Sequence, residues 1–202
     1  MREPDNISQV MDINPDYMGF IFYQGSKRYV NDIDSEALKK IPSGIRKTGV
    51  FVDSSFEDIT AAINKYHLDA VQLHGEESPE LCRRLKQEGI EVIKAFGINN
   101  DFDFTVLEEY TMVTDHFLFD TKTSSHGGSG KVFDWKSLEK YPYQTTYFLS
   151  GGLSLDNIED IQHIEDKRLY AIDINSKFES EPGIKDVEKI KKAINYIRLK
   201  KK

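Results

Sequence analysis

The chain has 202 residues and a formal net charge of −7 at pH 7. This length fits one domain with a sizeable core, and 39% hydrophobic with 30% charged residues is typical of a globular protein. The acidic balance argues against a nucleic-acid partner, which selects a basic face. The sequence has no apolar run long enough for a membrane span, no apolar region of a secretion signal, and a single cysteine. We therefore expect a cytoplasmic protein with neither a membrane nor a nucleic-acid partner.

Seven short runs rich in β-branched and aromatic residues alternate with segments of helical spacing. Each run has the length of a buried strand. The predicted strands are Tyr17–Tyr23, Lys47–Asp53, Ala70–Gly75, Glu91–Ile98, His116–Thr121, Tyr147–Gly151 and Leu169–Asn175.

The segments between the strands predict about eight helices. Ser55 to Asp58 has the pattern of a capping box, and Ser78 followed by Pro79 is a typical helix start. One helix opens the chain at Pro4–Asp12, and another closes it at Ile184–Leu199.

Strands that alternate with helices imply parallel pairing and an α/β fold. A TIM (β/α)₈ barrel has eight strands and eight helices and begins with a strand. We therefore predict that residues 1–202 form a single (β/α) barrel domain that is N-terminally truncated, with the first β-strand absent. An open doubly wound sheet also accommodates seven strands and is the alternative.

A missing first strand predicts a gap in the barrel between Tyr17–Tyr23 and Leu169–Asn175. Direct pairing of these two strands, or closure by a neighbouring molecule, would be the other outcomes.

Ligands of both α/β folds bind at the carboxyl ends of the strands. Asp120 follows the apolar run Phe117–Phe119 and is the strongest candidate for a general acid there. Asp53 and Asp173 occupy similar positions, so the residue type alone does not choose among the three. Arg28 can hold a carboxylate through its guanidinium fork.

Two strand ends have the composition of anion sites. Gly151 and Gly152 lie between a predicted strand and a helix expected near Asp156, where backbone N–H groups can point at an anion. Asn175 and Ser176 close the next strand and complete a cradle. Barrels build their usual phosphate site from the loops after strands seven and eight, which agrees with a missing first strand.

The glycine-rich loop Ser124–Lys131 suits a mobile lid that carries Lys131 to an anionic substrate. It is not a nucleotide-binding P-loop, because Ser125 and Val132 stand where that motif needs glycine and a hydroxyl residue. The five histidines lack metal-ligand spacing, and Cys82 falls on the apolar stripe of a helix as an inert core thiol. We therefore expect no metal and no cofactor.

Several stretches, in this order and at these spacings, are similar to phosphoribosylanthranilate isomerases, and the resemblance covers essentially the whole chain. The matching stretches are Met1–Asn6, Tyr17–Phe22, Ser26–Val30, Gly49–Asp53, Val71–Gly75, Phe119–Thr121, Gly127–Lys131, Phe133–Trp135, Leu149–Leu153 and Pro182–Asp186.

The resemblance implies an aldose–ketose isomerase of tryptophan biosynthesis. The reaction is an Amadori rearrangement of N-(5-phosphoribosyl)anthranilate to 1-(2-carboxyphenylamino)-1-deoxyribulose 5-phosphate, without a cofactor. In the family, a strand that ends in Cys-Gly precedes the segment matched by Met1 and supplies the general base. We therefore expect impaired activity from these 202 residues. A non-catalytic phosphosugar-binding remnant and another phosphosugar-isomerase barrel are the alternatives.

The resemblance also assigns roles residue by residue. Asp120 matches the family's general acid, and Arg28 matches the residue that holds the anthranilate carboxylate. Residues 175–179 depart from the family's usual paired serines followed by glycine, which affects the expected phosphate geometry. The remaining matches are the pocket wall and the phosphate cradle, formed by Gln72, His74, Gly151, Gly152, Asn175 and Ser176. The expected partner is a phosphorylated small molecule, bound by a monomer or a homodimer.

Overall fold

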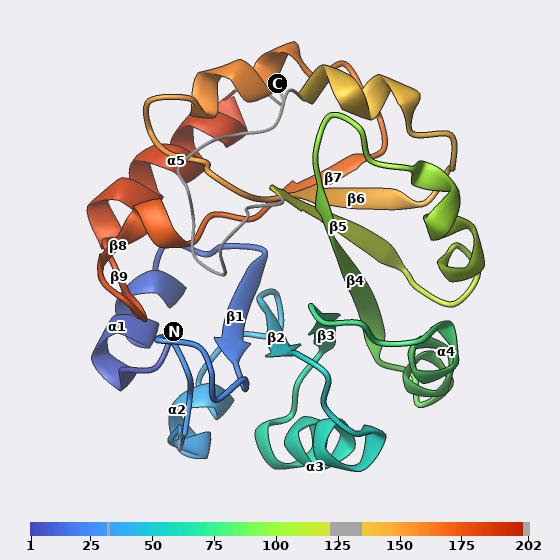
Figure 1. The fold of residues 1–202 in the computed structure, drawn as a ribbon. Helices are drawn as coiled ribbons and strands as arrows, with labels where there is room; N and C mark the ends of the chain where they lie inside the picture. The colour runs from blue at the N-terminus through green and yellow to red at the C-terminus, as the bar shows by residue number, and fades with distance from the viewer. Residues whose placement is uncertain (32, 122–134, 200–202) are drawn as a thin grey trace.

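A seven-stranded parallel sheet curls through the centre of the computed structural model, with helices around its outside (Figure 1). The structure describes residues 1–31, 33–121 and 135–199. The strands pair in chain order. They are β1 (Tyr17–Ile21), β2 (Arg46–Phe51), β3 (Ala70–Leu73), β4 (Glu91–Ile98), β5 (His116–Thr121), β6 (Thr146–Leu149) and β7 (Leu169–Ile172).

All seven predicted strands are present, and the α/β barrel architecture is confirmed. The bounds of β4 and β5 are as predicted, whereas β7 ends at Ile172, three residues before the predicted end. Beyond Ile172 the chain turns toward a short 3₁₀ helix at Ser176–Phe178, so Asn175 lies outside the strand.

Five α-helices are described, and two of them start as the caps predict. The Ser55 side chain accepts a hydrogen bond from the Asp58 amide, and the Ser78 side chain accepts one from the Leu81 amide. The α-helices are α1 (Pro4–Met11), α2 (Ser35–Lys39), α3 (Phe56–Tyr66), α4 (Pro79–Gln87) and α5 (Val187–Leu199).

The helices of the second half differ from the prediction because three of them are short 3₁₀ helices. They are η1 (Phe104–Tyr110), η2 (Trp135–Lys140) and η3 (Ile158–His163). The helix expected near Asp156 begins at Ile158. The Asn157 side chain accepts from the Ser154 amide and donates to the Gly152 carbonyl, and this turn takes the place of a first helical turn.

A small antiparallel hairpin near the end of the chain was not predicted. It pairs β8 (Glu179–Glu181) with β9 (Ile184–Lys185), so the last helix begins at Val187 and not at Ile184. Gly183 lies in the turn with φ +90°, a conformation that glycine adopts without strain. The hairpin lies beside α1 in Figure 1, and the Asn6 side chain bonds both the amide and the carbonyl of Lys185.

The barrel is open between β1 and β7, as predicted. Within the part of the chain that the structure describes, these two edge strands are not paired. The edge of β1 is nevertheless partly covered, because the Ile21 carbonyl accepts from the Val30 amide and the Gly19 carbonyl accepts from the Met1 nitrogen.

Buried side chains pack on both faces of the sheet. Larger clusters fill the space between the strands and the helices, whereas a smaller one lines the inside of the curl. Its buried members are Ala70, Ile93, Ala95, Leu118 and Phe148. The strands are thereby fixed, and their carboxyl ends meet at one rim of the curl. No helix of the described residues is both long and apolar enough to cross a membrane.

Candidate active site

Asp120 is the next-to-last residue of β5, and its carboxylate lies at the rim of the sheet. One carboxylate oxygen, Oδ1, accepts a 2.8 Å hydrogen bond from the Thr121 amide. The other, Oδ2, lies 3.5 Å from Nε2 of His74, and each of these side chains is about one third exposed. The predicted acid therefore faces an ionisable partner in a site that a small molecule can reach.

Gln72 and His74 come together at the end of β3, which is separated from β5 by β4. They are two residues apart on β3 and the loop after it, so they point to the same face of the sheet. The side-chain nitrogen Nε2 of Gln72 is 2.7 Å from Nδ1 of His74. Gln72, His74 and Asp120 thus form a continuous polar row across the rim.

Asp173 is the second carboxylate near this row. Its Oδ2 accepts a 3.0 Å hydrogen bond from the Ser150 hydroxyl. Removal from solvent raises the pKa of Asp173, and the negative charge of Asp120 raises it further, although the Ser150 hydrogen bond and the charge of Lys185 oppose this.

Asp53 is the third aspartate that the sequence offered as a candidate acid, and it holds the loop after β3. It has a positive φ of 50°, and its Oδ1 accepts a 2.7 Å hydrogen bond from the Glu76 amide. A Cβ atom added at Gly75 would come within 2.3 Å of the same oxygen, so Asp53 packs against the loop that follows β3. Asp53 is exposed and has this loop as its partner, whereas Asp120 faces His74.

Arg28 already binds a carboxylate, that of Glu179 at the start of β8. Nε of Arg28 lies 2.8 and 3.0 Å from the two Glu179 oxygens, and Nη2 lies 2.7 Å from one of them. This pairing uses one edge of the guanidinium and leaves the Nη1 end for a further acceptor.

Glu179 and Lys185 were missed in the sequence. Burial acts to raise the pKa of Glu179, but hydrogen bonds from Arg28 and the charge of Lys185 outweigh it and hold that pKa below its usual range. Lys185 also donates to Asn175 Oδ1 at 2.6 Å. Arg28 and Glu179 are 151 residues apart, and no local pattern in the sequence connects them.

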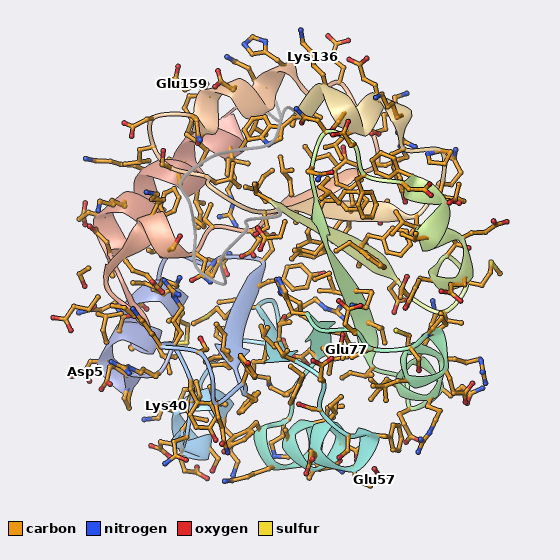
Figure 2. The ribbon with its side chains drawn as sticks, in the orientation of Figure 1. Asp5, Lys40, Glu57, Glu77, Lys136 and Glu159 are labelled. Carbon is orange, nitrogen blue, oxygen red and sulfur yellow. The ribbon has the colours of Figure 1, made fainter. Side chains whose placement is uncertain are left out.

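A buried ion pair between Lys94 and Glu77 supports the β3 end and was also missed. Nζ of Lys94 lies 3.1 Å from Glu77, and these side chains are 3% and 1% exposed. Glu77 accepts from the amides of Asp53 and Gly75, while Lys94 donates to the Gly75 carbonyl. Figure 2 shows Glu77 inside the ring of helices, whereas the five other labelled charged residues lie at its outer rim.

The predicted anion loop lies directly against Asp120. Gly151 and Gly152 have φ values of +87° and +67°. A Cβ atom added at Gly151 would come within 2.5 Å of Asp120 Oδ1 and of the Thr121 amide nitrogen. Among the residues that the structure describes, no acceptor is bonded to the amides of Gly151, Gly152 or Ser176. Within the described residues, these three amides are therefore donors without an acceptor, and Gly151 lies beside the acid.

Two further predictions concern Lys131 and Cys82. Lys131 lies outside the described residues, so its role stays a prediction. Cys82 is fully buried on α4, and burial raises the pKa of its thiol to about 11. As predicted, this cysteine belongs to the core. The described residues hold no group of three or more His, Cys, Asp or Glu side chains suited to a metal ion.

A family model described as N-(5'-phosphoribosyl)anthranilate (PRA) isomerase matches residues 1–196. The chain belongs to this family. A phosphoribosylanthranilate isomerase of Parabacteroides distasonis is 44% identical over 199 residues, which are 98% of this chain and 90% of that relative. The family's members are isomerases of tryptophan biosynthesis, as the sequence resemblance implied.

Solved phosphoribosylanthranilate isomerases have the same fold. The crystal structure from Thermotoga maritima matches with a TM-score of 0.82 and 36% identity, covering 98% of this chain and 95% of that one. Another, in complex with reduced 1-(o-carboxyphenylamino)-1-deoxyribulose 5-phosphate, matches with a TM-score of 0.80 and 33% identity over the same shares.

Proposed function

We propose that this isomerase uses Asp120 as the general acid of an Amadori rearrangement of N-(5'-phosphoribosyl)anthranilate. The observation that carries the proposal is the position of the Asp120 carboxylate at the rim, between His74 and the glycine loop. In this reaction an acid protonates the furanose oxygen, the ring opens to an imine, and loss of the C2 proton gives an enolamine that becomes the ketone. Asp120 performs the first of these proton transfers.

The substrate has a phosphate at one end and a carboxylate at the other. The site offers backbone amides for the first and the Arg28 guanidinium for the second. The phosphate binds the backbone amides of Gly151, Gly152, Asn175 and Ser176. Their N–H groups act as a phosphate site of the kind that glycine-rich loops form in barrels. The anthranilate carboxylate binds the Nη1 end of Arg28, whose other edge Glu179 holds in place. Lys131 is proposed to close over the phosphate.

Removal of the C2 proton requires a base, and Cys82 does not supply it. Its thiol is buried on α4 within the hydrophobic core, and its raised pKa disfavours the thiolate. We assign no general base among the described residues.

The phosphate proposal is tested by titrating the ¹⁵N-labelled chain with reduced 1-(o-carboxyphenylamino)-1-deoxyribulose 5-phosphate. The amide resonances of Gly151, Gly152, Asn175 and Ser176 should move together with one saturable affinity. Gly89, which also has a positive φ but lies after α4 with open space around it, is the internal control and should not move. Saturable shifts confined to other strand ends would contradict the proposed cradle.

A further inference from the structure

Gln72 makes a short hydrogen bond to the imidazole of His74, a contact that a residue lining the pocket does not need. Its Nε2 lies 2.7 Å from Nδ1 of His74. The other ring nitrogen of His74, Nε2, faces Oδ2 of Asp120 at 3.5 Å. The two contacts lie on opposite sides of one ring, so the imidazole of His74 lies between Gln72 and Asp120.

A neutral imidazole carries one N–H donor and one lone-pair acceptor. A side-chain amide nitrogen only donates, so His74 must accept at Nδ1 when Gln72 presents Nε2 to it. The proton of the neutral ring then resides on Nε2, the nitrogen that faces Asp120.

We propose that Gln72 is a positioning residue that fixes the Nε2–H tautomer of His74. The consequence for catalysis rests on the proposed role of Asp120 as the acid. An Nε2–H group can donate toward Asp120 but has no lone pair with which to accept its proton. The opposite tautomer would present a lone pair to the protonated acid and compete with the furanose oxygen for the proton. By fixing this tautomer, Gln72 prevents His74 from accepting the Asp120 proton, so that the proton goes to the furanose oxygen.

Steady-state kinetics distinguish this positioning role from direct substrate binding. If Gln72 acts through His74, its replacement should change the rate of the chemical step and leave the affinity for substrate nearly unaltered. If Gln72 binds substrate, its replacement should raise KM.

The direct test is the tautomer of His74 in the ¹⁵N-histidine-labelled chain, measured by NMR from the ring-nitrogen shifts. The His74 signals are assigned by their loss in His74→Gln. The parent should show a protonated Nε2 and an unprotonated Nδ1. In Gln72→Glu the ionised carboxylate can only accept, so Nδ1 should become protonated.

Gln87→Glu makes the same chemical change at the exposed end of α4 and should leave the His74 signals unchanged. If Gln72→Glu does not fold, Gln72→Met removes the hydrogen bond without adding charge and should give a mixture of tautomers. A parent with a protonated Nδ1, or a tautomer that survives both substitutions at Gln72, would overturn the proposal.

The kinetic consequence is measured separately. Gln72→Glu should lower kcat about tenfold and leave KM within about twofold of the parent value. The fall in kcat is smaller than the ~10²–10⁴-fold that general acid catalysis contributes, because Asp120 itself is still present. A raised KM with unchanged kcat would overturn the positioning role. If Asp120→Asn itself leaves kcat unaltered while the tautomer responds to Gln72, then the proposed acid is wrong and the assignment of the tautomer stands.

Discussion

Position 151, beside Asp120, requires glycine for two separate reasons. Its φ of +87° disfavours any side chain, and the space that a Cβ would occupy is filled by the Asp120 carboxylate and the Thr121 backbone. Only the second requirement concerns catalysis, so the two can be separated by experiment.

Gly151→Ala should lower kcat about 10²-fold, because misplacement of a reacting group by about 1 Å has effects of this size. Gly89→Ala is the matched control, since Gly89 has φ +80° and nothing within 4 Å of the added Cβ. The left-handed conformation should cost each variant about 1–2 kcal/mol of stability, and the contact with Asp120 and Thr121 adds to this cost at Gly151 alone. Steady-state kinetics and urea unfolding of both variants check this. Equal kcat for the two variants would contradict the close contact with Asp120.

At this scale the sequence was informative about single residues and uninformative about their partners. Asp120 was predicted as the candidate acid because it follows an apolar strand. The pairing of Arg28 with Glu179 was not predicted, because it joins segments 151 residues apart through the curl of the sheet. Asp53 and Asp173 occupy similar positions in the sequence, and their contacts distinguish them. Asp53 accepts from the Glu76 amide, whereas Asp173 accepts from the Ser150 hydroxyl near Asp120.

The carboxyl end of β3 depends on the Lys94–Glu77 ion pair. Lys94 on β4 donates to the carbonyls of Leu73 and Gly75, and Glu77 accepts from the Gly75 amide. A charge buried in this way is costly unless its partner is present. The pair therefore fixes the path of the loop between the core and the site.

Lys94→Met should lower the free energy of unfolding by about 3–5 kcal/mol, because it leaves Glu77 buried without a counter-charge. Adding Glu77→Gln should recover part of the loss. The exposed pair Lys39–Glu36 on α2 is the control, and Lys39→Met should cost less than about 1 kcal/mol. Urea unfolding measures all three. A loss at Lys94 no larger than that at Lys39 would contradict the structural role of the pair.

Elements with a strong local signal were predicted best. The strands have clear apolar runs, and Ser55 and Ser78 mark helix starts through their own hydrogen bonds. The 3₁₀ helices and the β8–β9 hairpin were not predicted. Helical spacing does not distinguish a 3₁₀ helix from an α-helix over six residues, and the hairpin depends on contacts of Lys185 with Asn6 on α1.

At the scale of the whole molecule, a polar network at the amino ends of the strands connects both edges of the open sheet. The Tyr17 hydroxyl of β1 donates to Glu91 of β4 at 2.8 Å and lies 3.5 Å from the Tyr170 hydroxyl of β7. Glu91 also contacts His116 of β5 and Arg46 of β2. The network spans the gap that backbone pairing leaves open.

This network predicts acid sensitivity. Burial acts to raise the pKa of Glu91, but hydrogen bonds from His116 and Tyr17 and the charge of Arg46 outweigh it and lower that pKa below 4.5. The ionised carboxylate therefore adds stability above about pH 4.5, and this contribution is lost as the pH falls through the lowered pKa. Glu91→Gln should cost about 1–3 kcal/mol at pH 7 and progressively less below pH 4.5. Urea midpoints of both proteins at several pH values measure this, and a cost independent of pH would count against it.

The central claim, that Asp120 is the acid of a phosphoribosylanthranilate isomerase site, is tested most directly by following the fluorescence decay of N-(5'-phosphoribosyl)anthranilate. The parent and Asp120→Asn are compared in the same assay. Asp120→Asn should lower kcat ~10²–10⁴-fold while affinity for the reduced product stays within a few-fold. An unchanged kcat in Asp120→Asn would contradict the account.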